Sequence, residues 1–177
     1  FTPVLITGCI IIMLSFAVRS SFGVFQIPIA DEFGWLRSEF SLAIAIQNLA
    51  WGVFQPVAGA LVPRIGFRAI MLLGAVMYLV GLIGLSVTTT GLGVLIFAGF
   101  CIGPAMGCAG TAITMSVASR AVSAKRRSLI LGIISAAGSA GTLYSAPLGQ
   151  SLSTSIDWRA GITAFAILAC LMIPAAW

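Results

Sequence analysis

The feature that most constrains this chain is a stretch without a single charged residue, from Ala69 to Ser119. It contains 51 residues and would measure about 76 Å as one α-helix, whereas about 20 residues are enough to cross a bilayer. The stretch must therefore reverse direction. Residues 88–93 are the predicted point of reversal, because three threonines and two glycines in this segment disfavour helix.

The composition of the whole chain points to the same environment. Charged residues make up 7% of the 177 residues, whereas soluble domains carry about 25%. This composition excludes a soluble globular enzyme, and the chain is too apolar to be disordered. A transmembrane β-barrel is disfavoured, because its strands alternate polar and apolar residues while this sequence stays apolar over tens of residues. The predicted fold class is all-α, a polytopic bundle of membrane helices.

The gaps between charges predict six transmembrane helices in a single domain, 1–177. A crossing needs about 20 predominantly apolar residues, which places the spans at about 4–29, 40–62, 69–87, 94–118, 128–152 and 159–177. The last span has no polar or basic flank at its end. We therefore expect the chain to be a fragment of a longer polytopic protein.

The charges between the spans predict an orientation. Two connections on one side, 63–68 and 120–127, hold six cations and no acid: Arg64, Arg68, Arg120, Lys125, Arg126 and Arg127. The connections on the other side hold all four acids, with only Arg37 and Arg159 as cations. Because cytoplasmic connections carry the excess of Lys and Arg, both termini are predicted to face the cytoplasm. The net charge of +5 then reflects topology, and no nucleic-acid partner is predicted.

The absence of histidine narrows the chemistry. A haem held by two imidazoles, a di-iron site of the usual type and a Ser/His protease all require this residue. The four cysteines lie in apolar runs without the spacing of a metal site. We therefore predict no metal, no cofactor and no enzymatic activity.

Arg19 is the one ionisable residue well inside a predicted span. It lies about 4 Å beyond the midpoint of the first span, where an arginine usually faces a cavity and meets an anion. Phe22 and Gln26 share its helix face. The alternative is that the side chain extends toward the outer surface or pairs with a helix carbonyl.

Polar side chains are distributed unequally over the six spans. In the second span, Gln47, Trp51 and Gln55 form one stripe, with Asn48 beside it. The fourth and fifth spans carry several hydroxyl residues and Tyr144, while the third and sixth are almost entirely apolar. This pattern predicts a polar cavity lined by four helices, although a single Ser or Thr more often joins helices by a hydrogen bond. The candidate substrate-binding residues are Arg19, Gln47, Asn48, Gln55 and Tyr144.

Small residues predict where helices approach one another closely. Gly99, Gly103 and Gly107 repeat every four residues in the fourth span, and the segment 138–141 of the fifth contains Gly, Ser, Ala and Gly. Such repeats form close helix contacts in membranes.

The segment 59–68, Gly-Ala-Leu-Val-Pro-Arg-Ile-Gly-Phe-Arg, resembles the GxxxDRxGRR signature of the major facilitator superfamily. In that family the signature forms a gating loop on the cytoplasmic side, and the matching residues are Gly59, Arg64, Gly66 and Arg68. Pro63 replaces the aspartate of the signature and Phe67 replaces an arginine. These departures weaken the charge relay that the resemblance implies.

A narrower resemblance extends over almost the whole chain. The segments 22–25, 33–37, 125–139 and 157–159 are similar, in their order and spacing, to monocarboxylate transporters and to bacterial oxalate/formate-type antiporters. That resemblance implies twelve helices in two halves, each built as a 3+3 inverted repeat, in a bacterial inner membrane. This chain would be the N-terminal half, with the lipid bilayer and a C-terminal six-helix half as its partners. Arg19 would bind a small carboxylate substrate, carried by alternating access.

Two alternatives remain open from the sequence. One is a transporter of the same superfamily for another substrate class, such as sugars or drugs, because the second span offers amides and an aromatic ring. The other is a membrane scaffold without transport activity, which would explain the apolar spans but not a buried arginine next to polar stripes.

Overall fold

The computed structural model describes residues 2–176, except for the side chains of 2–4 and 37. Within that range the chain is helical and contains no strand, which confirms the predicted all-α class. The elements in order are α1 (Thr2–Phe33), α2 (Arg37–Val87), α3 (Gly91–Val94), the π-helix η1 (Leu95–Ile102), α4 (Gly103–Ala109), α5 (Thr111–Ala121), α6 (Ala124–Ser155), α7 (Trp158–Ala169) and α8 (Met172–Ala176).

Five helical segments of the described chain are long and apolar enough to cross a membrane: Leu5–Phe33, Ser38–Val87, Gly91–Ala121, Ala124–Ser155 and Trp158–Ala176. The second contains a sharp break at Gly66, where φ is 85° and ψ is 157°. Only glycine adopts this conformation without strain. The parts before and after Gly66 each exceed the roughly 20 residues of one crossing, so the chain forms a membrane bundle of six segments.

The helices extend further than the apolar runs alone. α1 continues through Asp31 and Glu32 to Phe33, and α6 begins at Ala124, within the basic connection. Charged side chains end an apolar run without ending a helix, because Lys, Arg and Glu have good helix propensity. The reversal after Val87 falls in the predicted segment, since Thr88 is extended and α3 begins at Gly91.

The fourth and sixth segments are interrupted, although the sequence predicted continuous spans. Gly110 is extended, with φ −87° and ψ −168°, and separates α4 from α5. In the sixth segment α7 ends at Ala169 and α8 begins at Met172. Pro174 explains this second interruption, because it has no N–H to donate to the carbonyl of Cys170 four residues earlier.

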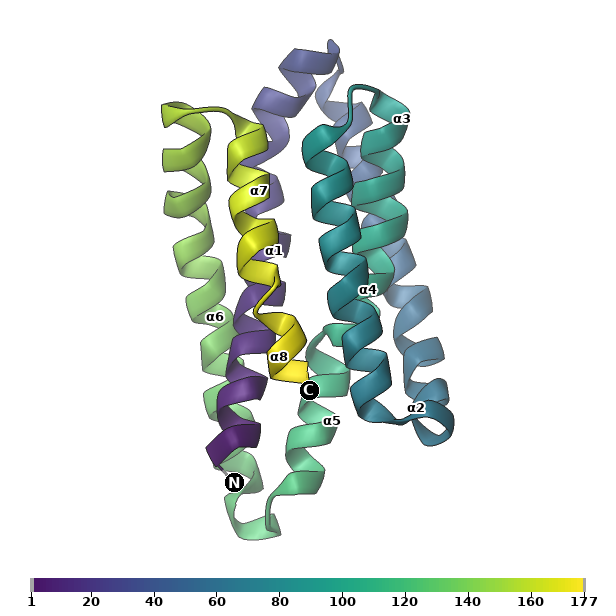
Figure 1. Ribbon diagram of the computed structural model, residues 1–177, viewed down its shortest axis with the longest axis vertical. Helices are drawn as coiled ribbons and strands as arrows, with labels where there is room; N and C mark the ends of the chain where they lie inside the picture. Colours follow the sequence, from purple (N-terminus) through teal and green to yellow (C-terminus); the bar gives the residue numbers. More distant parts are fainter. Residues whose placement is uncertain (1, 177) are drawn as a thin grey trace.

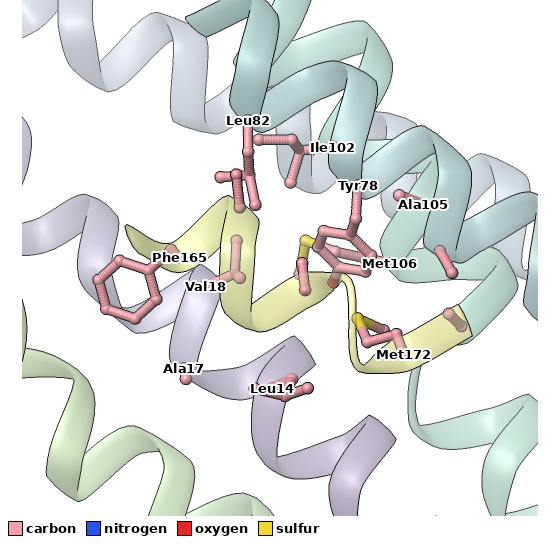
Figure 2. Packing of buried hydrophobic residues seen from close by; sticks show 14 of the residues in the cluster. Leu14, Ala17, Val18, Tyr78, Leu82, Ile102, Ala105, Met106, Phe165 and Met172 are labelled. Atoms are coloured by element: carbon pink, nitrogen blue, oxygen red, sulfur yellow. The ribbon is translucent and has the colours of Figure 1, made fainter. Parts of the chain in front are cut away.

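The helices pack around a hydrophobic core that contains residues from both ends of the sequence. α1 lies along α6, while α2 packs against η1 and α4 (Figure 1). Figure 2 shows buried side chains of α1, α2, α4, α7 and α8 in contact, with Val18, Tyr78, Met106 and Phe165 among them. The N-terminus lies at the end of the bundle where α5 connects to α6 and where α2 reverses (Figure 1).

Glycines bring η1 and α4 close to α2, as the repeat predicted. A Cβ atom on Gly103 would lie 2.7 Å from the Cβ of Ala50 and 2.7 Å from the carbonyl oxygen of Gln47. A Cβ on Gly107 would lie 3.0 Å from the backbone of Gln55. The small-residue segment of α6 behaves similarly, because a Cβ on Gly138 would lie 2.8 Å from Ile12. These contacts position the polar stripe of α2 against the fourth segment.

Candidate substrate-binding site

Arg19 lies at the middle of the apolar segment Leu5–Phe33. Its side chain is exposed to a hollow of about 410 Å³ between α1 and the start of α2. The guanidinium carbon lies 4.9 Å from the centre of the Trp51 ring. This cation–π contact restrains the guanidinium, which has five N–H donors in total with which to bind a ligand.

The hollow combines one cation with neutral polar groups. Gln26 of α1 and Gln47 and Asn48 of α2 line it together with Arg19, as do the aromatic rings of Phe22 and Phe40. Its described lining includes no Asp or Glu. In surroundings of low dielectric, an arginine without a carboxylate neighbour creates a positive potential that attracts anions.

The two predicted amide side chains at this hollow differ in their burial and in their hydrogen-bond partners. Gln47 is 2% exposed and donates from Nε2 to the carbonyl oxygen of Ala98 at 2.9 Å, which joins α2 to η1. Asn48 is exposed and donates from Nδ2 to the Ile44 carbonyl of its own helix at 2.9 Å. Gln47 therefore supports the wall of the hollow, while Asn48 offers its amide oxygen to the open space.

The helix break at Gly110 lies next to Arg19. Arg19, Trp51, Gly110 and Thr111 line a small cavity of about 10 Å³, which is close to the minimum for a single water molecule. The N-terminus of α5, the positive end of its helix dipole, therefore lines the same cavity as Arg19. The sequence did not predict this interruption.

A second hollow of about 360 Å³ lies toward the end of the bundle that carries the N-terminus. Gln55, Gly59 and Ser116 line it, and so does Arg120, whose guanidinium carbon lies 5.2 Å from the centre of the Phe67 ring. Gln55 thus belongs to a different hollow from Arg19, although it shares a helix stripe with Gln47.

The four residues that match the signature in 59–68 lie in different parts of the structure. Gly59 lines the second hollow, and Gly66 forms the break in α2. Arg64 and Arg68 are exposed at the end of the bundle. The position where the signature has an arginine is filled by Phe67, which contacts Arg120 instead.

The structure does not bring Tyr144 to either polar hollow. Its side chain is 68% exposed, and it lies beside an apolar cavity of about 170 Å³ with Met13, Leu148 and Phe165. The sequence also missed Phe40, Ser41 and Ile44 as lining residues. They precede Gln47 by three to seven positions, so extending the helical stripe toward the start of α2 would have found them.

Within the described part of the chain, no three His, Cys, Asp or Glu residues are grouped so that they could hold a metal ion. The cysteines are all free thiols: Cys9, Cys101, Cys108 and Cys170. The two polar hollows offer guanidinium, amide and hydroxyl groups, which are able to hydrogen-bond a solute.

Comparison with protein families identifies the architecture. The sequence profile of the family described as Major Facilitator Superfamily matches residues 8–177. The chain belongs to the major facilitator superfamily. The superfamily resemblance of the sequence is thereby confirmed.

Individual relatives support this membership. The chain is 28% identical over 160 residues to the uncharacterized MFS-type transporter YcxA of Bacillus subtilis (strain 168). The aligned region covers 88% of this chain and 38% of that protein. A crystal structure of the peptide transporter POT in complex with alafosfalin superposes with a TM-score of 0.84 at 15% identity, over 97% of this chain and 37% of that one. This second likeness shows the major facilitator fold alone. The chain spans less than two fifths of the length of both relatives.

Proposed function

We propose that this chain forms the N-terminal six-helix half of a twelve-helix secondary transporter, which moves a small organic anion such as a monocarboxylate by alternating access. The observation that carries the proposal is Arg19, a guanidinium at the middle of a membrane helix in a hollow whose described lining has no carboxylate. A carboxylate accepts two parallel hydrogen bonds from a guanidinium, which makes arginine well suited to this substrate.

The surroundings of Arg19 support anion binding and release. Trp51 restrains the guanidinium, while Gln26 and Asn48 add neutral polar groups on the opposite sides of the hollow. The N-terminus of α5 adds a partial positive charge nearby. Interrupted helices around a midplane site are typical of secondary transporters. In this arrangement one full charge selects anions, and the neutral groups allow the substrate to leave.

The proposed orientation places the N-terminus in the cytoplasm of a bacterial cell, with the helices in the inner membrane. Its support is the charge distribution, because the reversal at Gly66 and the α5–α6 connection carry the excess of Arg and Lys at the same end as the N-terminus (Figure 1). The remaining six helices of the proposed transporter would close the hollow from the other side.

The test is transport by the full-length protein in proteoliposomes, with labelled lactate, pyruvate and oxalate as probes. Arg19→Gln is expected to raise KM about 10- to 100-fold, because a hydrogen bond between charged partners contributes about 1.5–3 kcal/mol. Arg19→Lys should restore part of the affinity. Lys125→Gln removes an exposed cation in the first turn of α6 and should change neither KM nor the maximal rate. Unchanged carboxylate transport by Arg19→Gln would contradict the proposal.

A second candidate is transport of a neutral solute such as a sugar. Its support is the lining of the same hollow, where two phenylalanines and three amide side chains accompany Arg19. Labelled glucose and a dipeptide belong in the same assay as competitors. Inhibition of lactate uptake by lactate analogues only would favour the anion, whereas transport of glucose that is insensitive to Arg19→Gln would favour the neutral solute.

A further inference from the structure

We propose that Arg120, with Gln55 and Ser116, forms a second binding site for the transported anion, at the end of the pathway nearest the N-terminus. This inference rests on the proposed function. It assigns to a residue of the basic end of the bundle a role in the transport pathway in addition to its role in membrane orientation.

The two hollows have the same construction. Each contains one arginine whose guanidinium carbon lies over an aromatic ring of α2, Trp51 for Arg19 and Phe67 for Arg120, at 4.9 and 5.2 Å from the ring centre. A cation–π contact restrains a long side chain, and an arginine has five N–H donors with which to bind a ligand. Arg120 is therefore held in a geometry suited to binding a carboxylate.

The lining of the second hollow also suits an anion. Gln55 and Ser116 are half-buried and contribute an amide and a hydroxyl, and the described lining includes no Asp or Glu. Its volume of about 360 Å³ is close to the 410 Å³ of the hollow at Arg19. A solute that fits one hollow therefore fits the other.

The helix stripe of α2 connects the hollows. Gln47 lines the first, Gln55 lines the second, and Trp51 lies between them on the same face. The two hollows share no lining residue, and the cavity at Trp51 and Arg19 has a volume of only about 10 Å³, too little for a carboxylate. The two sites are thus separate in this conformation, and a movement of Arg19 and Trp51 would pass the anion from one guanidinium to the other.

The experiment compares transport from the two sides of the membrane. The full-length protein is reconstituted in one orientation, and the initial rate of labelled lactate transport is measured with lactate presented to either side. Arg120→Gln is expected to raise KM about 5- to 20-fold on the side of the N-terminus and to leave KM on the opposite side within twofold. Phe67→Leu keeps the charge of Arg120 but removes the aromatic ring beside it. A smaller rise in KM on the same side is therefore expected.

Lys125→Gln is the matched control, because it removes a neighbouring exposed cation that lines neither hollow. Arg120→Lys tests whether a charge alone restores affinity, and it replaces Arg120→Gln if that variant does not fold. The second site would be overturned if the Arg120 variants changed KM equally on both sides of the membrane. It would also be overturned if they lowered the maximal rate alone. If lactate transport also persists unchanged in Arg19→Gln, the proposed function fails; if it depends on Arg19, only the second site fails.

Discussion

The carboxylate of Glu32 and the guanidinium of Arg159 form an ion pair at 2.5 Å, although 127 positions of sequence separate them. The same guanidinium donates to the carbonyl oxygens of Ser86 at 2.9 Å and Thr88 at 2.7 Å, and Trp158 donates from Nε1 to Glu32. One arginine therefore joins the ends of α1, α2 and α7 on the side of the bundle opposite the N-terminus (Figure 1).

Arg159→Ala is expected to lower the free energy of unfolding by about 1–3 kcal/mol, because two backbone carbonyls and a carboxylate lose a charged donor. Thermal unfolding in detergent, followed by tryptophan fluorescence, measures the change. Asp157→Asn is the control, since it removes an exposed neighbouring charge and leaves a residue equally suited to a helix N-terminus. Equal stability of the two variants would contradict a joining role for Arg159.

Ser15→Ala should destabilise the protein by about 1–3 kcal/mol, because it leaves the hydroxyl of Tyr78 buried without its partner. The two hydroxyls lie 2.7 Å apart, and Tyr78 is fully buried. The double variant Ser15→Ala/Tyr78→Phe removes both polar groups and should recover most of the loss. A thermodynamic cycle over the four proteins measures the coupling, and additive effects would show that the bond contributes nothing.

Gly66→Ala is expected to cost about 1–3 kcal/mol of folding stability, since the backbone of Gly66 has a conformation that side chains strain. There is open space around Gly66, so the cost comes from the backbone and not from a clash. Gly52→Ala, in a helical part of α2 that is equally open, should be neutral or slightly stabilising. Chemical unfolding of both variants tests the difference.

Gly103→Ala should separate α4 from α2, because its Cβ would lie 2.7 Å from both Ala50 and the Gln47 carbonyl. Overpacking of this kind costs about 1–3 kcal/mol. Gly132→Ala provides the comparison, since a Cβ on this glycine of α6 would meet no other atom within 4 Å. A melting temperature of Gly103→Ala equal to that of Gly132→Ala would contradict the close contact.

Trp51→Leu is expected to raise KM for lactate about 2- to 30-fold with little change in maximal rate, because a cation–π contact contributes about 0.5–2 kcal/mol to the position of the Arg19 guanidinium. Trp51→Phe retains an aromatic face and should restore part of the affinity. A purely structural role for Trp51 would lower the maximal rate of both variants and leave KM unchanged.

Several features of the fold were predictable because they depend on local composition. The helical class follows from the long apolar runs, and the reversal after Val87 follows from three threonines and two glycines. The close approach of α4 to α2 follows from the spacing of Gly99, Gly103 and Gly107. The expectation that Arg19 faces a cavity also agrees with the hollow beside it.

Other features depend on tertiary structure. A glycine in an apolar run is compatible with a continuous helix, so nothing local distinguishes Gly110, where the helix breaks, from Gly107, where it continues. The rotation of α6 about its axis was similarly undetermined. Ser145 is 1% exposed, and the adjacent Tyr144 is turned about 100° away from that buried face, which removes it from the polar hollows. The stack of Arg120 on Phe67 joins elements far apart in sequence and has no local signature.

The single-residue break at Gly66 has a mechanical consequence. Because the two parts of α2 are joined at a single residue, a displacement of the end of the first part also displaces the start of the second. The first part carries Gln47 and Trp51, which line the cavities around Arg19. The second part carries Tyr78, whose hydroxyl is hydrogen-bonded to Ser15, one helical turn before Arg19. Both parts of α2 therefore reach the surroundings of Arg19, the first through the cavity walls and the second through a hydrogen bond to α1.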